Sequence, residues 1–183
     1  VGANLRMAGS GMHPTWLLVG SFALLCLVGS WVLMLPTARA PDAPELYYAD
    51  ARFTATSATC GTGLIGRRTG VDWTPFGQAV ILSMFQLGGL GIMLFGVVLA
   101  LLVGKGISVR GRTTMGEMLG TSGPGPVRKM LVFVVLFTLT MEMVGAALLY
   151  PVFLGAPDAR GAAMGPGQAA WYSVFHSVSA FCN

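Results

Sequence analysis

Three long apolar stretches dominate the pattern of hydrophobic and polar positions along the chain. Residues 16–35 and 78–103 contain no charged residue, and residues 130–154 contain a single acid, Glu142. A helix needs about twenty consecutive apolar residues to cross a bilayer. The pattern therefore predicts membrane-spanning helices at 16–35, 76–103 and 130–154.

Two shorter and more polar segments follow the first and third apolar stretches. Residues 46–64 open with alanines, threonines and serines in a helical pattern and then contain closely spaced glycines, at which a helix must end. Residues 168–183 have a similar composition after the third stretch. We expect each segment to be a short re-entrant helix. The predicted fold class is an all-α integral membrane protein.

An internal repeat supports this organisation. Residues 53–60 (FTATSATC) and 175–182 (FHSVSAFC) share four of eight positions at a constant offset of 122. Internal repeats are common in membrane transport proteins. We expect one complete unit of span, short helix and span, followed by part of a second unit, so that the chain is a fragment of a longer protein.

Composition and charge agree with a membrane protein. Hydrophobic residues make up 54% of the 183 and charged residues 10%, whereas soluble domains carry roughly a quarter charged residues. A cleaved signal peptide at 16–35 is an alternative that the absence of a good small-x-small cleavage site disfavours. The positive-inside rule predicts that residues 1–15 and the loop 104–129 are cytoplasmic, because basic residues outnumber Glu117 there (Lys105, Arg110, Arg112, Arg128 and Lys129). No basic tract indicates nucleic-acid binding.

The glycine loop after the first short helix permits two chemical interpretations. Gly61, Gly63 and Gly66 have the spacing of a dinucleotide-binding turn, but no buried strand precedes them and no acid lies between Asp72 and Glu117. The alternative is an ion filter, because glycines allow successive carbonyls to face one axis and replace the water around a cation. A plain turn between two spans is the third possibility. The three cysteines and two histidines have no metal-ligand spacing, so we expect no bound metal and no cofactor in this chain.

Five motifs together resemble the membrane subunit of Trk/Ktr-type potassium uptake systems and their plant HKT relatives. They are GSWVLMLP (29–36), FTATSATCGTGL (53–64), QLGGLGIM (86–93), EMVGAALL (142–149) and FHSVSAFCN (175–183), in the same order. The resemblance implies a pore formed by four span–pore helix–span repeats in one chain, with potassium as the transported substrate. It also implies a homodimer of pores in the lipid bilayer of a plasma membrane, and a cytosolic nucleotide-binding regulatory subunit.

The resemblance also assigns candidate residues. The first strand of the selectivity filter would comprise Thr59, Cys60, Gly61, Thr62 and Gly63, and the second would begin with Phe181, Cys182 and Asn183. Gln86 and Glu142 are expected to face inward: Gln86 would bond to filter or pore-helix backbone, and Glu142 would either accept hydrogen bonds from a pore helix or lie in or near the permeation path. Gly88, Gly89 and Gly91 would let the second span pack closely against its neighbours. We therefore expect potassium uptake rather than an enzymatic reaction. The alternative is a membrane scaffold or non-ion transporter in which the glycine loop is only a turn.

Overall fold

The chain folds into helices joined by loops. The computed structural model describes residues 14–104, 125–158 and 161–183. Within these ranges there is no strand beyond two isolated bridges, Arg39 with Trp73 and Pro157 with Ala163, so the all-helical prediction is confirmed. The helices are α1 (Pro14–Leu33), α2 (Tyr48–Cys60), α3 (Thr69–Asp72), α4 (Pro75–Gly104), α6 (Gly125–Phe153) and α7 (Pro166–Cys182).

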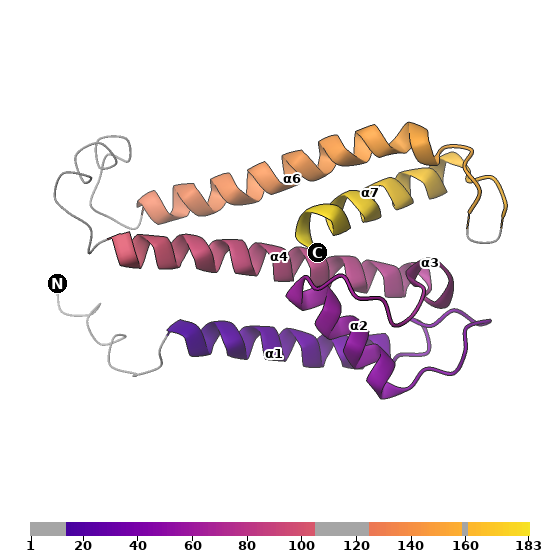
Figure 1. Cartoon of the computed structure of the whole chain (residues 1–183), viewed down its shortest axis with the longest axis horizontal. Helices are drawn as coiled ribbons and strands as arrows, with labels where there is room; N and C mark the ends of the chain where they lie inside the picture. Colours follow the sequence, from indigo (N-terminus) through magenta and orange to yellow (C-terminus); the bar gives the residue numbers. More distant parts are fainter. Residues whose placement is uncertain (1–13, 105–124, 159–160) are drawn as a thin grey trace.

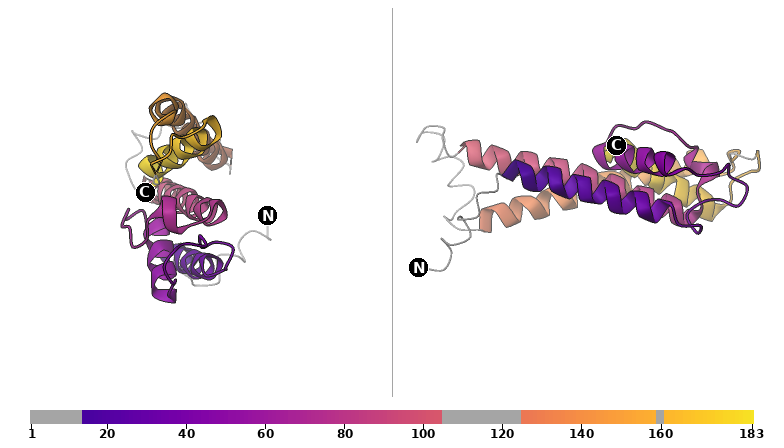
Figure 2. Two further views of the ribbon diagram at one scale, coloured as in Figure 1. Left: turned by 90° about the vertical axis from the view of Figure 1, so that its right-hand side faces the viewer. Right: turned by 90° about the horizontal axis from the view of Figure 1, so that it is seen from below.

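Helix α4 is the centre of the molecule. The long helices α1, α4 and α6 run lengthwise beside one another, with α1 and α2 packed on one side of α4 and α6 and α7 on the other (Figures 1 and 2). The shorter helices α2, α3 and α7 all lie in one half of the molecule, and the ends of α2 and α7 meet beside the middle of α4. Two segments 122 residues apart in sequence are thus brought together.

The long helices carry apolar side chains around most of their circumference. Trp16, Trp31, Phe133 and Leu148 are each at least 67% exposed, and large exposed apolar surfaces are typical of membrane contact. Among the described residues, two helical stretches are long and apolar enough to cross a membrane, Pro75–Gly96 and Lys129–Phe153. The described apolar part of α1, Leu18–Leu33, is shorter than the roughly twenty residues that cross a bilayer.

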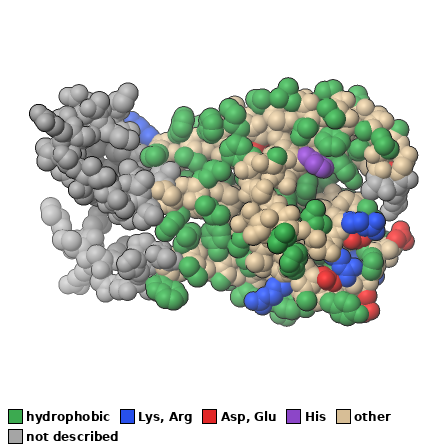
Figure 3. All heavy atoms as spheres, viewed as in Figure 1, with side chains coloured by type: hydrophobic (Ala, Val, Ile, Leu, Met, Phe, Trp, Pro, Cys, Tyr) green, Lys and Arg blue, Asp and Glu red, His purple; other side chains and the backbone are tan. Residues whose placement is uncertain are grey.

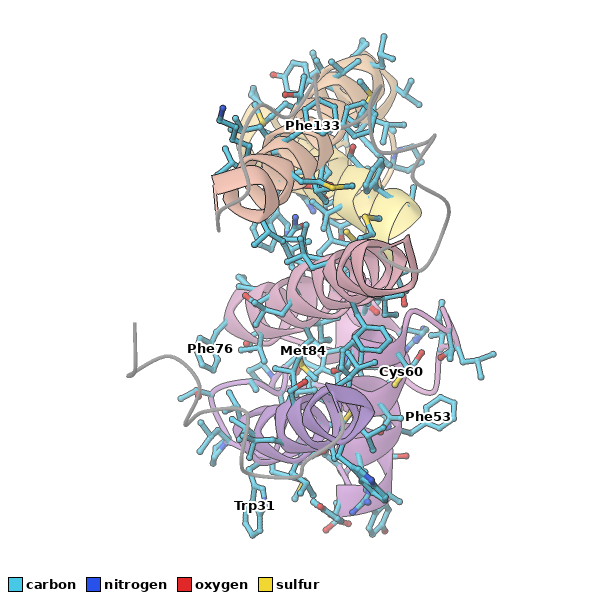
Figure 4. The ribbon with its side chains drawn as sticks, turned by 90° about the vertical axis from the view of Figure 1, so that its left-hand side faces the viewer. Trp31, Phe53, Cys60, Phe76, Met84 and Phe133 are labelled. Carbon is cyan, nitrogen blue, oxygen red and sulfur yellow. The ribbon has the colours of Figure 1, made fainter. Side chains whose placement is uncertain are left out.

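Small side chains allow the helices to approach one another. Ala51, Ala55 and Ala58 of α2 are buried in one cluster with Ile81 and Met84 of α4. Met84 points from α4 toward α1, where it contacts Gly29, whereas Trp31, Phe53, Phe76 and Phe133 point outward (Figure 4). The core is therefore narrow, and it lies between helices α1, α2, α4 and the second half of α7.

Helices α2 and α3 and the loops around them carry most of the charged side chains that the structure describes. Figure 3 shows Lys, Arg, Asp and Glu side chains gathered at this end, while hydrophobic side chains cover the long helices. The Thr74 hydroxyl caps the start of α4 by accepting from the Gly77 N–H, and it donates to the Thr37 carbonyl. Threonine is one of the preferred N-cap residues, and Pro75, which follows it, takes the first helical position, where proline is common.

Two predicted cytoplasmic segments lie largely outside the described residues. The N-terminal segment 1–15 is described only from residue 14, and the loop 104–129 is described only at 104 and from 125 onward. The start of α1, the end of α4 and the start of α6 all lie at the same end of the molecule (Figure 1). Which side of a membrane this end faces stays a prediction.

Candidate functional site

The ends of α2 and α7 are equivalent in structure as well as in sequence. Helix α2 ends at Cys60 and is capped by Gly61, whose N–H donates to the Ser57 carbonyl. Helix α7 ends at Cys182 and is capped by Asn183, whose N–H donates to the Ser179 carbonyl. The two caps, Gly61 and Asn183, are 122 residues apart, and so are the two acceptors, Ser57 and Ser179. The two similar sequence segments have the same offset. The internal repeat therefore corresponds to a structural repeat.

The turn after α2 depends on glycine conformations. Gly61 and Gly63 have φ values of 63° and 67°, in the left-handed region that costs other residues roughly 1–2 kcal/mol. Thr62 also donates its N–H to the Ser57 carbonyl, at 3.1 Å. These two bonds to one carbonyl end the helix and direct the chain sideways, which gives residues 61–66 an exposed, non-helical backbone.

Ser57 organises this turn, and the sequence analysis missed it. Its hydroxyl donates to the Leu64 carbonyl at 2.8 Å and accepts from the Thr62 hydroxyl at 3.0 Å, and the residue is 6% exposed. A small polar residue in a short helix does not stand out in a sequence. The signal that could have identified Ser57 is its match to Ser179 in the internal repeat. Ser57 thus connects the helix, the middle of the turn and its exit.

Two adjacent glycines of α4 make room for both helix ends. A Cβ atom at Gly88 would overlap the Thr59 carbonyl oxygen, and one at Gly89 would lie 2.8 Å from the Cys182 Cβ atom. Gly91 faces α1 instead, against Phe22. Close packing by small residues is therefore present. Gly88 packs against the first predicted filter strand, and Gly89 packs against the second.

The two helix ends also contact each other. The Gly63 N–H donates to the Asn183 side-chain oxygen at 3.2 Å. A Cβ atom at Gly61 would lie 3.3 Å from the Cys182 carbonyl oxygen, closer than an ordinary contact. The structure therefore brings together the two segments that the sequence analysis proposed as the first and second filter strands.

Glu142 joins the end of α7 to α6. This acid is 5% exposed, and its Oε1 atom accepts from the Cys182 thiol at 3.3 Å. Its backbone carbonyl accepts from the Ser177 hydroxyl at 2.7 Å. Glu142 is thus buried in this structure, and its contacts are to the second short helix.

Gln86 differs from its expectation in one respect. It lines a cavity of about 340 Å³ between α4, α6 and α7, which Glu142 also lines. Its side-chain nitrogen is buried and finds no hydrogen-bond partner among the described residues. The expected bond from Gln86 to filter or pore-helix backbone is therefore not formed through this nitrogen, because the side chain lies in the cavity.

A different glutamine of α4, Gln78, links α4 to the second short helix. The Trp171 indole N–H donates to the Gln78 oxygen at 2.7 Å, and the Gln78 nitrogen donates to the Trp73 carbonyl at 3.1 Å. Gln78 thereby fixes the first half of α7 relative to the loop before α4. Periodicity does not distinguish Gln78 from other polar positions near a helix start, so the sequence analysis did not single it out.

An ion pair holds the exit of the turn against the start of α2. Arg67 lies 2.6 Å from an Asp50 carboxylate oxygen and also donates to the Glu45 carbonyl. The hydrogen bond from Arg67, and then that from the Tyr47 N–H, hold the pKa of Asp50 below its ordinary value. Both ends of the segment from α2 to residue 67 are thus fixed to the same helix.

The meeting point of α2 and α7 presents backbone and hydroxyl oxygens together with the exposed Cys60 thiol and the Asn183 amide. Among the described residues, no three His, Cys, Asp or Glu side chains are grouped so that they could hold a metal ion. The exposed turn offers carbonyl groups beside the Thr62 hydroxyl, while Thr59 is fully buried. Carbonyl and hydroxyl oxygens can bind a cation by direct coordination.

Comparison with known proteins identifies the family. A family model described as TrkH, cation transport protein, matches residues 21–183. The chain belongs to the TrkH family. This confirms the resemblance drawn from the five motifs, and it makes the chain a membrane protein of a transport family rather than an enzyme.

Similar proteins in the TrkH family carry transport names. The Ktr system potassium uptake protein B of Bacillus subtilis is 36% identical over 170 residues, which are 93% of this chain and 36% of that protein. The potassium/sodium uptake protein NtpJ of Enterococcus hirae is 33% identical over 172 residues, 94% of this chain and 36% of that protein. A Ktr system potassium uptake protein B of Vibrio alginolyticus is 33% identical over 178 residues, 97% of this chain and 37% of that protein. The chain thus spans little more than a third of the length of these relatives.

Proposed function

We propose that the chain forms the first complete repeat and part of the second in the pore of a potassium uptake protein. The observation that carries this proposal is the meeting of two equivalent helix ends beside the middle of α4, with an exposed, glycine-dependent backbone between them. Non-helical backbone is tolerated at membrane depth only where it is buried in protein or lines a water-filled path. In a membrane protein, such a turn at that depth favours an ion path.

The coordinating groups in this proposal are carbonyl oxygens. The C-terminal ends of α2 and α7 carry the negative end of the helix dipole, which favours a cation near both. Carbonyl rings replace the hydration shell of potassium in filters of this kind. The first strand comprises Thr59, Cys60, Gly61, Thr62 and Gly63, and the second begins with Phe181, Cys182 and Asn183.

Support for these strands comes from α4 and α6. Gly88 and Gly89 permit the contacts behind the strands, and Glu142 holds the end of the second helix. Gln86 lies beside Glu142 in the same cavity, where it contributes polar surface at the junction of the two repeats. Potassium is the transported substrate in this proposal, and the chain needs no cofactor for its role.

The remaining parts of the proposal concern the complete protein. Relatives named for Ktr systems support a regulatory partner, which we propose to be cytosolic and nucleotide-binding, and we propose that two complete pores form a homodimer. The end of the molecule that contains the starts of α1 and α6 would face the cytoplasm of a bacterial inner membrane. The short helices would then enter from the outer side.

The test is uptake of rubidium, as a potassium substitute, and of sodium by the full-length protein that carries this chain. The host lacks its own potassium uptake, and the variant is Gly63→Ser. A serine at φ 67° is strained, so we expect the preference for rubidium over sodium to fall at least about tenfold, the equivalent of about 1.4 kcal/mol.

The matched control is Gly155→Ser in the loop after α6. Gly155 also has a positive φ, 77°, and open space around it, so it carries the same backbone strain far from the turn. We expect this variant to keep the parental preference. If both variants transport like the parent, residues 59–63 are only a turn, and the scaffold or non-ion transporter alternative gains support.

A further inference from the structure

The hydrogen bond between Gly63 and Asn183 determines the direction in which the Thr62 carbonyl points. The Gly63 N–H points at the Asn183 side-chain oxygen, 3.2 Å away. That N–H and the Thr62 carbonyl belong to one peptide group, and the described residues contain no cis peptide bond. In a trans peptide these two groups lie in one plane and point in opposite directions. The bond therefore directs the Thr62 carbonyl away from α7.

Little else fixes this peptide. Gly61 and Gly63 flank Thr62 on both sides, and glycine leaves adjoining peptide groups free to rotate. The Thr62 N–H and hydroxyl are held by Ser57, but these bonds act on the peptide before Thr62 and on its side chain. The peptide after Thr62 is held by the partner that Asn183 supplies from the other repeat.

Asn183 is itself held in place. Its N–H donates to the Ser179 carbonyl at 2.9 Å, and the preceding residue, Cys182, is fixed by Glu142 and by the close approach of Gly89. The side-chain oxygen of Asn183 is thus presented from a rigid helix end. A partner of this kind keeps an orientation that a mobile side chain would not.

We propose that Asn183 is a specificity-determining positioning residue, whose side-chain oxygen orients the Thr62 carbonyl of the first filter strand. The inference rests on the proposed function, in which that carbonyl coordinates potassium. It assigns to the second repeat a direct role in shaping the first, beyond the strand that it contributes itself. Potassium preference then depends on a hydrogen bond between repeats.

The test compares Asn183→Leu with Asn183→Asp in the full-length protein. Leucine has a similar size and no acceptor, whereas aspartate retains an oxygen at the same distance along the side chain. We expect Asn183→Leu to reduce the preference for rubidium over sodium about five- to tenfold, as for the loss of one net hydrogen bond. Asn183→Asp should stay closer to the parent than to the leucine variant.

Gln168→Leu is the matched control, since it makes the same change from amide to leucine at the other end of α7. Gln168 is exposed and lies far along the helix from the turn, so the control should keep the parental preference. Membrane abundance of all variants is measured alongside, because a folding defect would lower both uptakes together and leave their ratio unchanged.

Hydrogen exchange of the Gly63 amide in the purified protein tests the bond without any transport. We expect this amide to exchange about five- to tenfold faster in Asn183→Leu than in the parent, and at close to the parental rate in Asn183→Asp. Unchanged exchange in Asn183→Leu overturns the inference, as does faster exchange with an unaltered preference. If the parent takes up neither cation, the proposed function fails and the specificity role fails with it. Exchange then shows whether the bond between repeats exists on its own.

Discussion

The two helix ends that meet beside α4 share a backbone design and differ in how they are attached. At the end of α2, Cys60 is exposed and interacts with the Cys26 thiol of α1, while Ser57 organises the turn that follows. At the end of α7, Cys182 is buried and donates to the Glu142 carboxylate of α6. The first end therefore has side-chain bonds within its own segment in addition to its contacts with α1 and Asn183, whereas the Cys182 side chain of the second end bonds to a neighbouring helix.

This difference separates a local feature, the capped helix end, from a tertiary one, the attachment of that end to neighbouring helices. A helix end with its glycine or asparagine cap is a local structure, so it recurs wherever the local sequence recurs. Its attachment depends on the residues opposite, and α1 and α6 present different ones. The turn after α2 thus has hydrogen bonds inside its own segment, and the end of α7, which is held to α6, contacts that turn.

The largest effect is expected where α4 touches both ends. Alanine at Gly88 would overlap the Thr59 carbonyl, which is backbone and cannot rotate away, so we expect a loss of about 3 kcal/mol or more. Gly89→Ala meets the Cys182 side chain and should cost less, about 1–2 kcal/mol. The measurement is thermal unfolding of the purified full-length protein together with its membrane abundance.

Gly96→Ala is the control for this pair, because it lies on the same helix and no heavy atom would come within 4 Å of its new Cβ atom. It should be neutral or stabilising by up to about 1 kcal/mol through helix propensity. Equal losses of stability in Gly88→Ala and Gly89→Ala would contradict the expectation that α4 packs more tightly against the end of α2 than against the end of α7.

A smaller effect should distinguish the hydrogen bonds within the turn after α2 from the hydrogen bond between α7 and α6. Ser57→Ala removes two side-chain bonds within the first turn, so we expect the preference for rubidium over sodium to fall about tenfold. Ser177→Ala removes one bond from α7 to α6, so we expect a loss of about 1 kcal/mol in stability and an unchanged preference. Uptake ratios and thermal unfolding are measured for both. The opposite pattern, with preference lost in Ser177→Ala alone, would contradict the comparison.

The smallest effect concerns the ion pair at the exit of the first turn. The pKa of Asp50 is lowered in the folded protein, so its bond to Arg67 stabilises the fold at a pH above its unfolded value, near 4, and is lost as the pH falls through the folded value. We expect the parent to exceed Asp50→Asn in stability by less than about 1 kcal/mol at about pH 7, and by less still at about pH 3.

Thermal unfolding of both proteins across this pH range checks the expectation, with Glu45→Gln as a control for loss of a nearby acidic charge. The expected stability difference is small because both side chains of the pair retain some exposure, 14% for Arg67 and 30% for Asp50, so solvent screens the interaction. A stability difference between parent and Asp50→Asn that does not change with pH would show that the ion pair is not its source.

By itself, the sequence determined the helical class, the family and the positions where helices must end. Apolar stretches and closely spaced glycines act locally, because hydrophobicity and backbone freedom belong to each residue wherever it lies. Gly61 is the example: its place after FTATSATC was enough to predict the end of a helix, and α2 ends beside it. The match of residues 53–60 to 175–182 likewise anticipated two similar helix ends.

The tertiary structure alone decided which residues meet. Gly88 and Gly89 were expected to permit close packing, but only the rotation and register of α4 place them against Thr59 and Cys182. The same packing leaves the Gln86 side-chain nitrogen without a hydrogen-bond partner among the described residues and brings Gln78 to Trp171. The bond between Gly63 and Asn183 joins residues 120 positions apart. No local pattern encodes such a contact, because it depends on the packing of several helices together.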